Sequence, residues 1–112
     1  MSYPHDRQFY RLSYPVRGAP RFVASGLTHR VVDIGEGGFR YASEDPSVPE
    51  LGAVVAGVIE FTEGEPLELE GIVVRVQGGE VAVHCAQRAI PLAVVLREQR
   101  YVRKHFPFRD AT

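Results

Sequence analysis

The sequence predicts an all-β fold with one terminal helix: a small six-stranded antiparallel β-barrel followed by a C-terminal α-helix. Short runs of alternating apolar and polar residues, separated by turns rich in Gly and Pro, occupy the chain up to about residue 86. The apolar residues then change to a helical spacing over residues 91–106. With 112 residues, 45% of them apolar, the chain has the size of one domain with a real core. Several short strands and one amphipathic helix are typical of a closed barrel on which the helix packs.

The first half of the predicted barrel lies before the polar loop of residues 43–52. Residues 12–23 contain two prolines, which restrict a strand to an edge or a bulge, so we expect one irregular strand there. Residues 27–34 predict the second strand, which ends at a Gly-rich turn, and residues 38–42 predict the third.

The second half of the predicted barrel consists of residues 53–62, 67–76 and 81–85. The strand over residues 67–76 begins with Leu alternating with Glu and then changes phase, so that Ile72 and the alternate residues after it take over the apolar face. Gly71 stands at the change of phase and predicts a β-bulge.

The helix is predicted over residues 91–106. Pro91 suits the first turn, Pro107 ends the helix, and the basic last turn suits the helix dipole. The charged residues, Glu98 among them, are expected largely outside the apolar face.

We expect a single domain over residues 1–112. Within it, residues 1–11 are interpreted as a flexible N-terminal switch segment, residues 12–86 as the barrel and residues 91–106 as the helix.

Charge is unevenly distributed, although the net charge is only −1. Residues 1–40 hold six Arg against three acids, residues 41–80 one Arg against nine acids, and residues 81–112 six Arg or Lys against two acids. A chance clustering of surface charges is one interpretation. The other is a cationic face, built from both ends of the chain, that suits an anionic ligand. The slightly acidic total argues against nucleic acid as a partner.

Several classes of function find no support in the sequence. Cys85 is the only cysteine, so no internal disulfide is expected, and it offers a poor metal site because it follows His84 on a strand and points to the opposite face. We see no pair of catalytic carboxylates and no activated nucleophile, so we predict that the protein is not an enzyme. No apolar stretch reaches the roughly 18 residues of a membrane span, and no signal peptide is recognised, so we expect a cytoplasmic protein.

Two short motifs carry the functional prediction. Arg7 and Arg11 form R-x-x-x-R, and Asp33 to Gly38 form D-x-G-x-x-G at the end of a predicted strand. Arg7 and Arg11 project to one side whether the segment is helical or extended. A guanidinium group can grip phosphate or the O6/N7 edge of guanine, a carboxylate accepts from the guanine N–H donors, and glycines let the backbone approach closely.

The two motifs together resemble those of the PilZ domain, a bacterial receptor for cyclic di-GMP, and the resemblance covers about residues 5–105. That family carries R-x-x-x-R near its N-terminus and [D/N]-x-S-x-x-G on the following hairpin. The resemblance implies a non-catalytic receptor that binds cyclic di-GMP, uses no metal and relays the signal to a protein effector. The residues that it assigns to the ligand are Arg7, Arg11, Asp33, Gly35 and Gly38.

One motif position departs from the family, because Gly35 stands where the family has Ser. The loss of one neutral hydrogen bond costs about 0.5–1.5 kcal/mol, or at most roughly tenfold in affinity. The alternative is therefore an interaction adaptor of the same fold that has lost nucleotide binding. Arg17, Arg21 and Arg40 are interpreted as ordinary surface charges.

Overall fold

The structure is a computed structural model, which describes residues 11–43, 48–86 and 88–107. These residues form seven strands and one helix: β1 (Arg11–Ser13), β2 (Arg21–Ala24), β3 (Leu27–Gly35), β4 (Gly38–Ala42), β5 (Val54–Glu60), β6 (Leu67–Gln77), β7 (Glu80–Cys85) and α1 (Leu92–His105).

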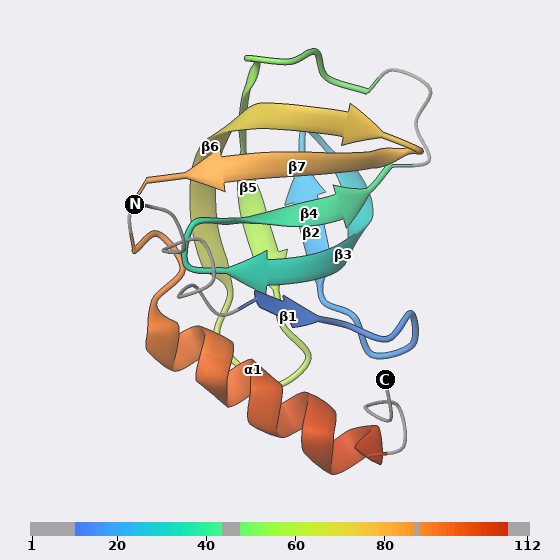
Figure 1. Cartoon of the computed structure of the whole chain (residues 1–112), viewed down its shortest axis with the longest axis vertical. Helices are drawn as coiled ribbons and strands as arrows, with labels where there is room; N and C mark the ends of the chain where they lie inside the picture. The colour runs from blue at the N-terminus through green and yellow to red at the C-terminus, as the bar shows by residue number, and fades with distance from the viewer. Residues whose placement is uncertain (1–10, 44–47, 87, 108–112) are drawn as a thin grey trace, which may run out of the picture.

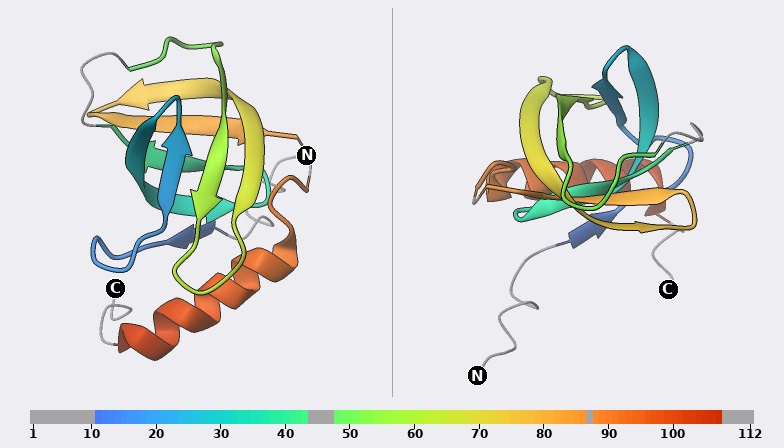
Figure 2. Two further views of the ribbon diagram at one scale, coloured as in Figure 1. Left: turned by 180° about the vertical axis from the view of Figure 1, so that it is seen from behind. Right: turned by 90° about the horizontal axis from the view of Figure 1, so that it is seen from above.

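Six strands close into an antiparallel barrel in the order β3-β2-β5-β6-β7-β4, with β4 returning to β3 (Figure 1). The additional strand β1 pairs with the C-terminal end of β3, along the edge whose N-terminal part pairs with β2. The helix α1 lies across the end of the barrel where β1 runs, as Figures 1 and 2 show from opposite sides. The predicted six-stranded barrel with a C-terminal helix is confirmed.

The single irregular strand predicted over residues 12–23 is wrong in detail, because two separate strands, β1 and β2, occupy this region. Pro15 and Pro20 lack the N–H that a ladder needs, and Gly18 has a φ of 95°, so the chain leaves the sheet between the two strands. The Phe106 ring occupies the space beside Gly18, 2.6 Å from where a Cβ would stand.

The predicted bulge at Gly71 is also wrong. The register between β6 and β7 shifts later, between Val73 and Arg75. Gly71 points into the barrel, where a Cβ would lie 2.5 Å from the carbonyl oxygen of His84, so the inner face continues unchanged to Val73. Ile72, predicted on the apolar face, therefore points outward and is 48% exposed.

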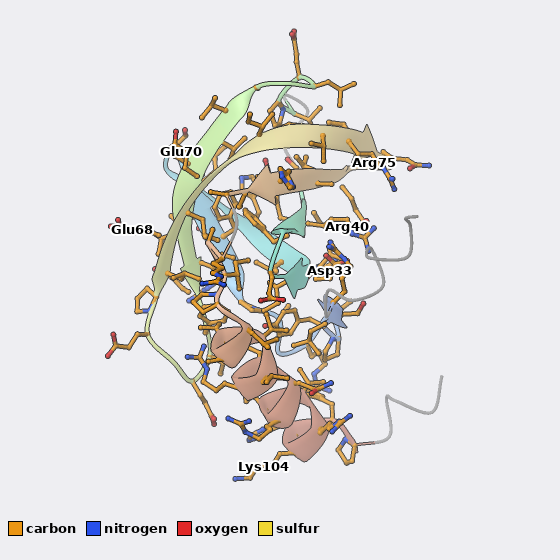
Figure 3. The ribbon with its side chains drawn as sticks, turned by 60° about the vertical axis from the view of Figure 1, so that its left-hand side comes forward. Asp33, Arg40, Glu68, Glu70, Arg75 and Lys104 are labelled. Carbon is orange, nitrogen blue, oxygen red and sulfur yellow. The ribbon has the colours of Figure 1, made fainter. Side chains whose placement is uncertain are left out.

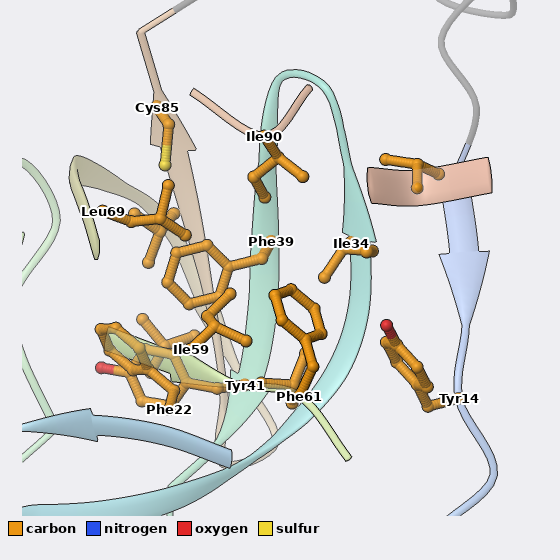
Figure 4. Packing of buried hydrophobic residues seen from close by; sticks show 14 of the residues in the cluster. Tyr14, Phe22, Ile34, Phe39, Tyr41, Ile59, Phe61, Leu69, Cys85 and Ile90 are labelled. Atoms are coloured by element: carbon orange, nitrogen blue, oxygen red, sulfur yellow. The ribbon is translucent and has the colours of Figure 1, made fainter. Parts of the chain in front are cut away.

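The core fills the barrel and the layer between barrel and helix (Figure 4). The Phe22 ring meets the Phe39 ring edge-on at 4.8 Å between centroids and lies 5.1 Å from the Tyr41 ring. Such aromatic contacts add to the stabilisation from area burial. Cys85 belongs to this core, and burial raises the pKa of its thiol to about 11.

The helix buries a carboxylate that the sequence pattern placed outside the apolar face. Glu98 is only 2% exposed and shares the buried stripe with Val95 and Val102. The Tyr14 hydroxyl donates to one Glu98 carboxylate oxygen at 2.7 Å, and the Arg97 guanidinium donates to the other at 3.2 Å. Buried charge is tolerated when it is paired and hydrogen-bonded in this way.

Candidate functional site: an arginine–aspartate cluster beside a glycine hairpin

The β3–β4 hairpin turns through two residues, Glu36 and Gly37, with Gly35 paired opposite Gly38. The loop is tied to β7 by a hydrogen bond from the Cys85 N–H to the Gly37 carbonyl, 2.9 Å long. Gly38 has a φ of 152°, and a Cβ there would stand 2.0 Å from the Val83 carbonyl oxygen of β7. Only glycine fits where the two strands approach so closely.

Asp33 lies at the centre of the candidate site. Its side chain is 3% exposed, and each of its oxygens accepts from a different arginine. Arg11 of β1 donates through Nη2 to Oδ1 at 2.9 Å, and Arg40 of β4 donates through Nε to Oδ2 at 2.7 Å. We call these three residues the Asp33 cluster; two of its members are labelled in Figure 3.

Arg40 extends the cluster to β7, because its Nη1 also donates to the Glu80 carboxylate at 3.1 Å. The hydrogen bond to Asp33, chiefly, raises the pKa of the Arg40 guanidinium. The interpretation of Arg40 as an ordinary surface charge is therefore wrong. The length of the turn could have predicted this contact. A two-residue turn that pairs Gly35 with Gly38 also pairs Asp33 with Arg40 across the hairpin.

The structure brings most of the predicted site residues together. Arg11 is the register partner of Gly35 across β1 and β3, and its side chain reaches Asp33 two residues away. Gly38 completes the same hairpin. Arg7 lies outside the described residues.

The cluster combines positive and negative groups, which suits a ligand that carries both anionic oxygens and N–H donors. The Arg11 side chain is 50% exposed and the Arg40 side chain 36%, so both present donors at the surface while Asp33 is held beneath them. Arginine donors bind anions such as phosphate, and a fixed carboxylate accepts from N–H groups of a base.

The described part of the chain lacks two further features, a membrane-spanning helix and a metal-binding group. No helix there has the length and apolar character needed to cross a bilayer. Nor do three His, Cys, Asp or Glu side chains gather there as a potential metal-binding group.

The fold and the Asp33 cluster define the class of protein: a small closed β-barrel that presents arginine and aspartate beside a glycine hairpin on its outer surface. The chain belongs to the PilZ domain family, whose model matches residues 5–103. This family is one of non-catalytic receptors for cyclic di-GMP.

A solved structure supports the fold independently. The chain is similar to the crystal structure of an uncharacterized Legionella protein, with a TM-score of 0.61 and 19% sequence identity. The alignment covers 86% of this chain and 99% of the Legionella chain. No curated protein matches the sequence.

Proposed function

We propose that this protein is a receptor that binds cyclic di-GMP through Arg7, Arg11, Asp33 and the turn from Gly35 to Gly38. The observation that carries the proposal is the position of Arg11, which pairs in register with Gly35 and donates to Asp33 at 2.9 Å. One half-exposed arginine, one fixed carboxylate and a glycine turn thus meet at one place on the barrel.

In this proposal Arg11 exchanges partners when the ligand binds. The phosphate takes the Arg11 guanidinium, and Asp33 accepts from the N1–H and N2–H donors of a guanine. Arg40 keeps its hydrogen bond to Asp33 throughout, because a buried carboxylate without a counter-charge is strongly unfavourable. Arg40 thereby makes the release of Arg11 possible.

Strand β1 supplies a route from the ligand to a protein effector. The strand begins with Arg11, and Tyr14 directly follows it and bonds to Glu98 of α1. A displacement of Arg11 on ligand binding is therefore transmitted along residues 11–14 to the hydrogen bond between Tyr14 and Glu98 of the helix. We propose that the effector recognises the surface formed by β1 and α1.

Isothermal titration calorimetry with cyclic di-GMP tests the binding proposal. We expect the wild-type protein to bind and Arg11→Ala to bind at least tenfold more weakly, because a charge-assisted contact is lost. Arg21→Ala is the matched control, since Arg21 is a 69% exposed arginine on β2. Equal heats for wild type and Arg11→Ala, or no binding by the wild type, would contradict the proposal.

The second candidate function is a protein-interaction adaptor that has lost the nucleotide, and Gly35 is the observation that favours it. A pull-down of partners whose yield does not change with cyclic di-GMP would support the adaptor. Gly35→Ser restores the motif hydroxyl. Binding by Gly35→Ser but not by the wild type identifies a degraded site, whereas similar affinities show that the hydroxyl is dispensable.

A further inference from the structure

The strand register places a second arginine beside the Asp33 cluster. Ala82 of β7 is the register partner of Arg40 on one side and of Arg75 on the other. Val81 and Val83 are buried in the barrel, so Ala82 between them points outward. Arg75 and Arg40 therefore flank a methyl group on the outer surface. In Figure 3, Arg75, Arg40 and Asp33 follow one another along the same side of the barrel.

A parallel row of residues continues this surface toward the hairpin. His84 of β7 is exposed and is the register partner of Gly38 on one side and of Ile72 on the other. Gly38 pairs in turn with Gly35. Because Gly38 and Gly35 have no side chains, no side chain projects from the sheet between His84 and Arg11.

The two rows together form a shelf on the outside of β7 and β4. Its floor is Ala82 and Gly38. Arg75 of β6 forms the far rim, and His84 stands beside Ala82 on the outer face of β7. Neighbouring strands lie about 4.8 Å apart, so the backbones that carry Arg40 and Arg75 are separated by about 10 Å. A base that lies flat on Ala82 and Gly38 would point the edge of its ring toward the Arg75 guanidinium.

Arg75 is available for such a contact. Arg40 is engaged by Asp33 and Glu80, whereas Arg75 makes no ion pair with any residue that the structure describes. Glu80, the acidic neighbour two residues from Ala82, has its charge offset by Arg40 at 3.1 Å. Arg75 is also the only basic residue between residues 41 and 80.

We infer that Arg75 and His84, around Ala82, form a second base subsite in which Arg75 reads the O6/N7 edge of a guanine. A bidentate arginine at this edge is the commonest specific contact to guanine, and adenine cannot reproduce it because N6–H₂ replaces O6. The inference rests on the proposed function: Asp33 takes one guanine of the cyclic dinucleotide and the shelf takes the other.

Calorimetry on the full chain tests the subsite with two ligands, cyclic di-GMP and the mixed cyclic dinucleotide that has one guanine and one adenine. We expect the wild type to prefer cyclic di-GMP, and Arg75→Ala to bind it about tenfold more weakly and to lose most of that preference. Arg21→Ala on β2 is the control for loss of an exposed positive charge, and it should keep both affinity and preference.

A second variant tests the floor. Ala82→Leu adds a branched side chain to the outer surface without touching the barrel interior, so it should weaken binding at least tenfold while the thermal midpoint stays near that of the wild type. Unchanged affinity and base preference in both Arg75→Ala and Ala82→Leu, with Arg11→Ala impaired, would overturn the subsite and leave the proposed function intact. No binding by the wild type would overturn both.

Discussion

At Asp33 a strand position on the outside of the barrel holds a buried charge. The side chain is 3% exposed, and both carboxylate oxygens are paired, one with Arg11 and the other with Arg40. Removing one partner of a buried ion pair destabilises the fold more than breaking an ion pair in water does. The remaining charge stays buried without a counter-charge. The two arginines are therefore not equivalent to surface ion pairs such as Arg21 with Glu60, which are 3.9 Å apart and exposed.

We predict that Arg40→Ala destabilises the fold by about 1–2 kcal/mol, because Asp33 keeps only Arg11 as a partner. The same variant should weaken cyclic di-GMP binding, since Arg11 can no longer leave Asp33 without stranding the carboxylate. Urea unfolding followed by circular dichroism measures the first effect and calorimetry the second. Arg21→Ala should change stability by less than about 0.5 kcal/mol, and an equal loss in both variants would refute the special role of Arg40.

The site residues differ in how far the sequence reveals them. Arg11, Asp33, Gly35 and Gly38 stand in motifs, so their proximity could be predicted. Arg40 could also have been found, because the two-residue turn fixes its position opposite Asp33. Arg75 could not, since its position beside Ala82 depends on a register shift between Val73 and Arg75, whereas the change of apolar phase in this strand placed the shift at Gly71.

At the scale of elements, β1 is a short strand whose attachment depends on few contacts. Among the described strands its three residues pair with β3 alone. Tyr14 then adds a backbone bond to the Val32 carbonyl at 2.9 Å and the side-chain bond to Glu98. On the helix side, Arg97 holds the other Glu98 oxygen and stacks over the Phe61 ring at 5.0 Å. The buried carboxylate thus joins β1 and α1.

We predict that Tyr14→Phe lowers the free energy of unfolding by about 1.5–3 kcal/mol, since a buried carboxylate loses a donor. The measurement is the urea midpoint at constant m-value. Tyr101→Phe is the control. Tyr101 lies on α1, as Glu98 does, and its hydroxyl makes no hydrogen bond to any described residue, so this variant should leave the midpoint nearly unchanged. A midpoint for Tyr14→Phe within error of the wild type would show that the Tyr14–Glu98 bond contributes little.

The sequence predicted those features of the helix and strands that depend on the local spacing of apolar and turn residues. It did not predict the features that depend on contacts with residues far away in the chain. The helix and the strands β3, β4, β5 and β7 follow from periodicity and turn residues. The inward direction of Gly71 follows instead from the close approach of β7. Glu98 was misassigned because its partner Tyr14 lies 84 residues earlier in the chain, and a helical pattern contains no information about it.

At the scale of the whole molecule, the barrel interior and the layer between barrel and helix bury several weakly acidic groups. Burial raises the pKa of Cys85 to about 11 from an ordinary value of 9.0. Burial, and after it the Glu98 carboxylate, also raise the pKa of the Tyr14 hydroxyl, and burial raises that of Tyr41. In each case the folded state holds its proton to a higher pH than the unfolded chain does.

We therefore predict that the free energy of unfolding is nearly constant between pH 7 and about pH 8.5 and falls above pH 9. Between pH 9 and 11 the unfolded chain releases the Cys85 proton while the folded protein retains it, which costs about 1.4 kcal/mol for each pH unit. The two tyrosines add to the slope above pH 10, where unfolded tyrosines ionise. Twelve of the thirteen basic residues are Arg and stay charged, so loss of positive charge contributes little. Urea unfolding from pH 7 to 10.5 measures the curve. Cys85→Ala should flatten it between pH 9 and 10 whatever its stability at pH 7, and a slope unchanged in that variant would exclude the buried thiol as the cause.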